Sequence, residues 1–397
     1  MLALLVLTVL GGCGGVPATD GSTGPEIDPA AVEQTLQRWG EAALAGDRSA
    51  FDAEVSTRDP AFAATATRLF DDLGRLGSLR WELGPRRGPL PPTRRGLLGP
   101  DAVVAPATVS WTPEGAADTL RAVVWTTWVV EDGAPRLAGT VDGPDTADGP
   151  TPSWWVEDVT VQQVGGATVV TGASPDPDLW RERVERALAA VEAAGLDAAR
   201  PTGPPPSVVV QVPSSRRLAE RVAGSAALLE GAAAVTLVDV GGALPVLVDP
   251  AAGLSEESWV FLLTHELVHV RTASPGNGSP RWLVEGLAES VARKAQPELL
   301  GTSREQAAAA AEVGPLPTDE QLREEPYAAY LCSWVAVELL RQRLGHAGAL
   351  DVVAATADGR SVADVLAAAD VPSGELEREV AAALEDLAAG REVPALR

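Results

Sequence analysis

The sequence predicts an α+β fold: an N-terminal domain of helices with a curved antiparallel sheet, then a second domain with a small sheet followed by a mostly helical half. Three features of the chain lead to this prediction. Apolar residues recur at helical spacing between residues 29 and 76, alternate as in strands up to residue 171, and return to helical spacing after residue 255. The chain has 397 residues, 46% of them hydrophobic, which suffices for two or three domains with buried cores.

The first residues form an apolar run that ends in Leu10-Gly11-Gly12-Cys13. The run is shorter than the ~20 residues that span a bilayer, and it fits the hydrophobic region of a secretory signal. Its end resembles a bacterial lipobox, although no Lys or Arg precedes the run. The resemblance implies that residues 1–24 are a signal and flexible tether, and that a lipid on Cys13 anchors an extracytoplasmic protein to the outer face of the bacterial cell membrane. The alternative is a buried strand with an incidental cysteine.

The first domain is expected over residues 25–172. Asp28 and Pro29 open a helix, because Asp caps a helix N-terminus and Pro fits its first turn. A second helix covers residues 61–76. Strands are expected over residues 79–83, 102–111, 119–130, 136–141, 155–164 and 167–171. Helices before a long antiparallel meander resemble the cone-shaped NTF2-like domains. That implies an accessory domain whose tryptophans either pack the core or line a ligand pocket in the cone.

The second domain is expected over residues 173–397. It begins with a helix around Trp180, and a further helix is expected over residues 214–230. Strands are expected over residues 207–212, 234–240 and 244–248. Pro245 has no N–H to donate to a ladder, so the last of these strands is expected at the edge of the sheet, where it would pair with an extended peptide.

The residues that carry chemistry begin with His265, Glu266 and His269 in one apolar helix, which starts at the N-cap Ser255. Two histidines four residues apart leave the same face of a helix, so both imidazoles can bind one metal ion. Glu266 can act as a base toward the water that attacks a substrate. Because the chain has only 3 histidines, this pairing favours a metal site over two satisfied histidines in an ordinary helix.

The string WLVEGLAES, residues 282–290, follows a Gly-rich turn. Together with HELVH at residues 265–269, it resembles the gluzincin zinc metallopeptidases, the thermolysin-like and aminopeptidase-like group. The resemblance implies a zincin-like domain that binds Zn²⁺ through His265, His269 and a third ligand, Glu285, although Glu285 lies slightly closer to His269 in sequence than in the best-known members. Glu289, one turn later, either accepts a hydrogen bond from His265 or is an ordinary surface carboxylate.

A further donor completes the resemblance. Gluzincins usually add a Tyr or His that stabilises the tetrahedral intermediate. Tyr330 with Ser333 matches the Tyr-x-x-Ser string that often opens a helix after the zinc ligands in related sequences, which implies that Tyr330 is this donor. Alternatively, Tyr327 and Tyr330 simply pack at the start of that helix.

These features predict a zinc metallopeptidase that hydrolyses a peptide or protein substrate outside the cytoplasmic membrane. The formal net charge of −24 argues against nucleic acid as a partner, because such binding needs a basic surface. One alternative is a lipoprotein binding module whose zinc domain is structural or inactive. Another is a zinc hydrolase that acts on a non-peptide amide.

Overall fold

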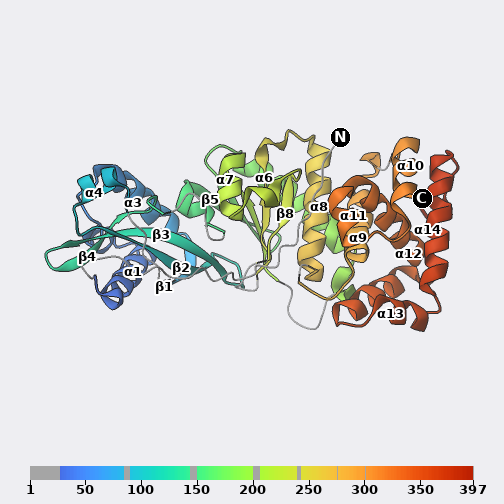
Figure 1. Ribbon diagram of the computed structural model, residues 1–397, viewed down its shortest axis with the longest axis horizontal. Helices are drawn as coiled ribbons and strands as arrows, with labels where there is room; N and C mark the ends of the chain where they lie inside the picture. The colour runs from blue at the N-terminus through green and yellow to red at the C-terminus, as the bar shows by residue number, and fades with distance from the viewer. Residues whose placement is uncertain are drawn as a thin grey trace.

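The computed structural model describes residues 27–84, 90–143, 150–199, 206–238, 243–274, 276–299 and 301–396. These residues form an elongated molecule in which an N-terminal helix-and-sheet unit, a second sheet and a helical half follow one another along the long axis (Figure 1). The predicted α+β class is confirmed, with strands concentrated in the first two parts and helices in the last.

The N-terminal unit packs helices against one antiparallel sheet. Its helices are α1 (Pro29–Leu44), α2 (Arg48–Ala53), α3 (Pro60–Leu73) and α4 (Pro92–Leu98). Its strands pair in the order β1 (Leu76–Leu83), β2 (Val103–Pro113), β3 (Leu120–Glu131) and β4 (Ala134–Gly139). Asp28 caps α1 as expected, because its side chain accepts a hydrogen bond from the backbone N–H of Ala30.

Aromatic rings fill the interior of this unit. Trp39 stacks on Phe51 with ring centroids 4.8 Å apart. Trp81 and Trp154 each pack against Trp155, at centroid distances of 5.9 and 5.7 Å. Large rings in such offset or tilted contacts are a major source of burial energy. Of the two interpretations of these tryptophans, core packing is therefore the one that the structure supports.

The second sheet contains strands from both sides of residues 172–173, where the boundary between the two domains was expected. Its strand order is β5 (Val159–Val164), β6 (Ala167–Gly172), β7 (Val208–Val212), β9 (Val246–Val248) and β8 (Ala234–Thr236). β5 and β6, expected in the first sheet, thus belong to the second, where β6 pairs in parallel with β7. β6 is buried along its whole length, with Val169 in the core of the helical half and Val170 in that of the N-terminal unit. A strand covered on both faces belongs inside a sheet, and its sequence does not reveal which strand it pairs with.

The edge of this sheet also differs from the expectation. β9 lies between β7 and β8, so the strand expected at the edge is interior, and the edge strand on that side of the sheet is β8. Pro245 stands just before β9, where its missing N–H removes no ladder bond, and its carbonyl accepts the N–H of Leu237 at 2.8 Å. β8 runs antiparallel to β9 and leaves one side of its backbone unpaired within the described sheet.

Two local expectations are also corrected. The helix expected over residues 214–230 ends early, because α7 (Arg216–Ala223) stops at Gly224, whose φ of 74° breaks the helix before the 3₁₀ turn η2 (Ala226–Leu229). The strand expected from residue 155 begins only at β5, because Trp154 and Trp155 lie in the short helix α5 (Ser153–Val156).

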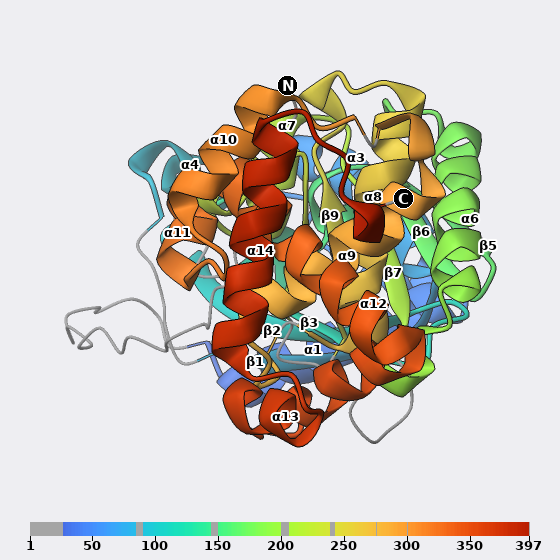
Figure 2. The ribbon, with the colours of Figure 1, turned by 90° about the vertical axis from the view of Figure 1, so that its right-hand side faces the viewer.

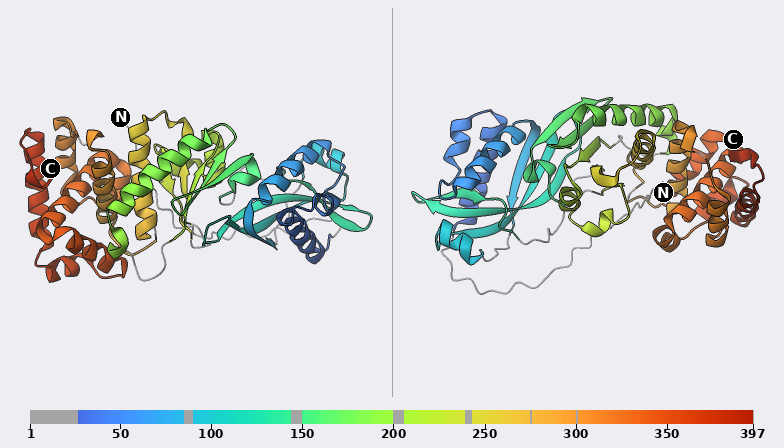
Figure 3. Two further views of the ribbon diagram at one scale, coloured as in Figure 1. Left: turned by 180° about the vertical axis from the view of Figure 1, so that it is seen from behind. Right: turned by 90° about the horizontal axis from the view of Figure 1, so that it is seen from above.

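Helices cover the second sheet and form the far half of the molecule. α6 (Pro177–Ala193) crosses the sheet (Figure 3), and α8 (Glu256–Thr272) lies between the sheet and the helical half. That half, seen end-on in Figure 2, contains α9 (Arg281–Ala295), α10 (Arg304–Val313), α11 (Asp319–Glu324), α12 (Pro326–Ala357), α13 (Val362–Ala368) and α14 (Ser373–Ala388). Within the described ranges, every helix is too short or too polar to span a membrane.

Candidate metal centre

Helix α8 presents two imidazoles on one face. His265 and His269 lie four residues apart, and their ring centroids are 4.9 Å from each other. The helix begins at its Ser255 cap, whose side chain accepts the N–H of Ser258. Leu267 and Val268, between the histidines, are 1% exposed and pack into the core, so the helix cannot rotate to move the imidazoles elsewhere.

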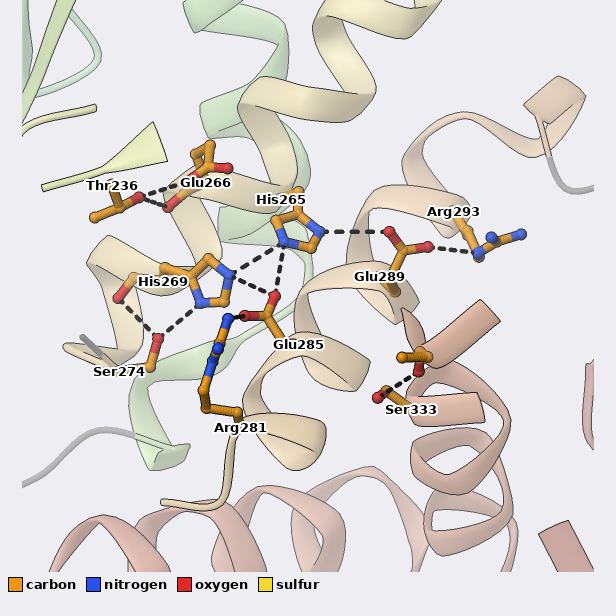
Figure 4. Close-up of polar contacts among 11 residues, drawn as sticks. Thr236, His265, Glu266, His269, Ser274, Arg281, Glu285, Glu289, Arg293 and Ser333 are labelled. Atoms are coloured by element: carbon orange, nitrogen blue, oxygen red, sulfur yellow. Dashed lines mark hydrogen bonds and ion pairs between the residues drawn. The ribbon is translucent and has the colours of Figure 1, made fainter. Parts of the chain in front are cut away.

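Glu285 of α9 reaches the same point as the two imidazoles (Figure 4). Its Oε2 lies 3.2 Å from Nε2 of His265 and 3.2 Å from Nε2 of His269, and the two Nε2 atoms are 3.1 Å apart. In the part of the chain that the structure describes, this group of side chains is the one placed to hold a metal ion. The fold thus brings together the three residues expected as ligands.

The spacing of these three atoms fits one tetrahedral metal ion. With metal–ligand distances of about 2.0–2.1 Å, neighbouring ligand atoms of a tetrahedral zinc site lie roughly 3.3–3.4 Å apart. The observed triangle has sides of 3.1–3.2 Å, so a single ion can contact all three atoms. All three side chains are at most 2% exposed, and buried acceptor atoms that face one another are stabilised by a proton or a metal ion between them.

The outer nitrogen of each imidazole faces an oxygen. Nδ1 of His269 lies 2.8 Å from Oγ of Ser274, and Nδ1 of His265 lies 3.6 Å from Oε1 of Glu289, slightly beyond hydrogen-bond length. Protons on both Nδ1 atoms would meet these oxygens and leave both Nε2 lone pairs directed at the centre of the triangle. That tautomer is the one a metal ion requires. Glu289 is therefore not a surface carboxylate, because it is 4% exposed and lies behind His265.

The charges at the site favour a bound cation. Burial lowers the pKa of His265, but the carboxylates of Glu285 and Glu289 outweigh it and raise this pKa to about 10. Burial raises the pKa of Glu285, but the imidazoles of His269 and His265 bring it well below its ordinary value. The carboxylate therefore stays ionised, and the site attracts either a proton or a metal ion.

Glu266 lies beside this triangle and points toward β8 (Figure 4). Its Oε2 accepts a hydrogen bond from the hydroxyl of Thr236 at 2.7 Å, and its side chain has no exposed area. Its other oxygen, Oε1, finds no donor among the described residues. A buried carboxylate oxygen without a donor can accept a proton from a molecule that enters the site.

Two arginines hold the carboxylates of α9. The Arg281 guanidinium lies 3.6 Å from Oε1 of Glu285, the oxygen that faces away from the triangle. One turn beyond Glu289, Arg293 donates to its Oε2 at 2.8 Å, and the same guanidinium stacks 4.4 Å from the ring centroid of Trp334. Because a cation occupies the far side of each carboxylate, the near oxygens remain directed at the histidines.

Tyr330 and Ser333 have different surroundings. Tyr330 is 3% exposed, and its ring centroid is 5.9 Å from that of His265, so the ring of the expected oxyanion donor packs beside this histidine. Ser333 donates to the carbonyl of Ala329 within its own helix, at 2.8 Å. Tyr327 is 40% exposed. Cys13, expected to carry the lipid, lies outside the described residues.

The glycine after Glu285 lets two helices meet closely. A Cβ at Gly286 would collide with the backbone carbonyl of Ser333 on α12. The α9–α12 crossing at this point therefore requires glycine, and it sets the position of Glu285 relative to α8.

In comparisons with known proteins, no family model matches the chain, and no curated protein matches it significantly.

Four residues of the site were not found from the sequence: Thr236, Ser274, Arg281 and Arg293. The two arginines could have been found, because each stands four residues from the glutamate it contacts and helical side chains at that spacing meet. Ser274 follows the last turn of α8 but its contact depends on how the helix ends. Thr236 depends on which strand lies beside α8, and no local pattern indicates that.

Proposed function

We propose that this protein is a zinc-dependent peptidase. The observation that carries the proposal is the convergence of Nε2 of His265, Nε2 of His269 and Oε2 of Glu285 within 3.2 Å of one another, next to a second buried carboxylate, Glu266. Two imidazoles and one carboxylate are a recurrent ligand set of catalytic zinc in hydrolases. A zinc ion bound there would act as a Lewis acid and make water a better nucleophile near neutral pH.

The protein groups have separate roles in this proposal. Glu266, anchored by Thr236 and with Oε1 free of donors among the described residues, accepts the proton of the attacking water and passes it to the leaving amine. Tyr330 is the candidate donor to the developing oxyanion. Glu285, Glu289, Arg281 and Arg293 hold the ligand geometry.

An edge strand of the second sheet supports a peptide rather than another amide as substrate. Of the two edge strands, β5 and β8, the second carries Thr236, which is bonded directly to Glu266. An extended peptide that added to this edge by main-chain hydrogen bonds would lie next to the base. We therefore propose that the peptide binds along β8 instead of along residues 244–248.

Glu266→Gln tests the catalytic role. Glutamine keeps the shape and can still accept from Thr236, but it cannot take up a proton. We expect metal content of about one zinc per chain and unchanged thermal unfolding, with hydrolysis of an unfolded protein substrate reduced on the order of 100- to 10,000-fold.

Tyr330→Phe tests the oxyanion donor. It should reduce the rate of hydrolysis of the same substrate roughly 100- to 1,000-fold if the hydroxyl contacts the oxyanion.

Glu338→Gln is the matched control, because Glu338 is a buried glutamate of α12 that bonds to Ser290 and Lys294 instead of to the histidines. It should keep full activity. Equal activity of Glu266→Gln and wild type would refute the catalytic role. Since the ligands are buried, that result would favour a structural ion in a binding lipoprotein.

The identity of the metal is tested separately by metal analysis of the purified protein. Iron in place of zinc would refute the metal assignment.

The membrane anchor is a separate part of the proposal. The lipobox at residues 10–13 supports a lipid on Cys13 and a position on the outer face of the cell membrane. Cys13→Ala should then move the protein from the membrane fraction to the medium, as measured by fractionation and immunoblotting. An unchanged membrane fraction would contradict the anchor and leave the peptidase proposal intact.

A further inference from the structure

The end of helix α8 places a hydroxyl behind the second histidine. Ala273 ends the helix in the left-handed conformation, with φ of 49°, and its N–H bonds back to the carbonyls of His269 and Val270. The next N–H, that of Ser274, also bonds to the carbonyl of His269, at 3.1 Å. This tight reversal folds Ser274 back onto the last turn, so that its Oγ lies 2.8 Å from Nδ1 of His269.

The surroundings of this hydroxyl offer its proton an acceptor other than the imidazole. Oγ of Ser274 lies 3.5 Å from the carbonyl oxygen of His269, which can only accept. With the hydroxyl proton directed there, the Oγ lone pairs face Nδ1 of His269. The imidazole then carries its proton on Nδ1 and leaves Nε2 bare.

We propose that Ser274 is a positioning residue for the metal centre: it accepts the Nδ1 proton of His269 and so holds that imidazole in the tautomer and orientation that bind zinc. The inference rests on the proposed zinc site. It assigns to a hydroxyl the role that the carboxylate of Glu289 has behind His265, so the two imidazoles are supported by different chemical groups.

Among the described residues, the hydroxyl of Ser274 contacts His269 alone. Ser274 is 8% exposed and belongs to the turn between α8 and α9. Ser279 in the same turn provides the contrast, because its hydroxyl lies 3.0 Å from Oγ1 of Thr356 on α12. One serine of the turn thus faces the candidate metal centre and the other faces the helical half.

The experiment measures the zinc affinity of the full chain by competition with a chromophoric chelator after metal removal. Ser274→Ala should weaken zinc binding about 10- to 100-fold, because the outer partner of a ligating histidine typically has that effect. Ser274→Thr, which keeps a hydroxyl, should bind close to wild type. Ser279→Ala, the matched control, loses a hydroxyl of the same turn and should also bind like wild type. Thermal unfolding of the metal-free proteins compares their stability.

The outcomes separate this inference from the proposed function. If wild type binds no zinc, both fail. If wild type binds zinc and Ser274→Ala binds equally well, the inference alone is overturned. It is also overturned if Ser274→Ala and Ser279→Ala weaken binding alike, since the effect would then come from the turn, or if Ser274→Thr loses as much affinity as Ser274→Ala.

Discussion

Asp72 in the N-terminal unit and Glu285 in the candidate metal centre are both buried carboxylates, each 2% exposed, yet their pKa values shift in opposite directions. Burial, the largest influence on Asp72, raises its pKa to about 6, although Arg68 and Arg75 lie 3.0 and 3.3 Å away. Burial acts on Glu285 in the same sense, but the two imidazoles overcome it and lower its pKa.

The difference lies in what else the partners do. Arg68 also donates to the backbone carbonyls of Trp154, Trp155 and Glu157, so its guanidinium is not dedicated to Asp72. The effect of burial on Asp72 therefore prevails, and this carboxyl can hold a proton. The partners of Glu285 converge on one oxygen from two sides. The interactions of Asp72 are therefore all made within the chain, whereas the arrangement around Glu285 can also accept a metal ion from outside.

Removing Glu285 tests this contrast with the largest expected effect. Zinc at roughly 1,000 times its dissociation constant should stabilise wild type by about 4 kcal/mol, and Glu285→Ala should lose most of that gain because two imidazoles alone hold the ion weakly. Chemical unfolding in the presence of zinc and in the presence of a chelator measures this zinc-dependent stabilisation. Asp72→Asn is the control and should keep the whole zinc-dependent gain; an equal gain in Glu285→Ala would mean that another group is the third ligand.

The helix contact behind Glu285 gives the next largest effect. Gly286→Ala should destabilise the metal-free protein by about 2–3 kcal/mol, because the new methyl group collides with the backbone of α12. Gly96→Ala in α4 is the matched control, since a Cβ there meets open space and alanine favours a helix. Urea unfolding of both variants compares them. No loss in Gly286→Ala would show that α9 can shift without cost, and that the glycine does not set the position of Glu285.

The pH dependence of stability tests the other carboxylate. The pKa of Asp72 is about 6 in the folded protein against 3.8 for an ordinary Asp, so between these values the folded state binds the extra proton. The contribution of Asp72 to the free energy of unfolding therefore falls as the pH rises from about 4 to about 6, by on the order of 2 kcal/mol. Urea unfolding at several pH values should show this fall in the difference between wild type and Asp72→Asn. A difference that is independent of pH would contradict the raised pKa.

The smallest expected effect concerns the carboxylate behind His265. Glu289→Gln keeps an oxygen near Nδ1 but removes the negative charge, so zinc affinity should fall about tenfold, equivalent to about 1.4 kcal/mol. Chelator competition measures this change. An affinity equal to that of wild type would show that the contact at 3.6 Å contributes nothing to metal binding.

The sequence predicted those parts of the site that depend on local spacing. His265 and His269 share a face because four residues make about one helical turn, and Ser255 marks the start of that helix by its capping chemistry. Glu285 was expected only through resemblance to a family, and the packing of α9 on α8 and α12 brings it to the histidines. The predictions about strands were wrong where they depended on which strands pair: β6 pairs with β7, and β8 instead of residues 244–248 lies at an edge of the sheet.

By itself, the sequence determined where α1 and α8 begin, which of their residues share a helical face, and that the chain combines helices with strands. These properties follow from caps and periodicity, which act over a few residues. Only the tertiary structure decided which strand is outermost, that Thr236 holds Glu266, and that Ser274 lies behind His269. The reason is physical: such contacts join segments whose separation in sequence carries no signal, and they form only when buried surfaces and backbone hydrogen bonds are satisfied together.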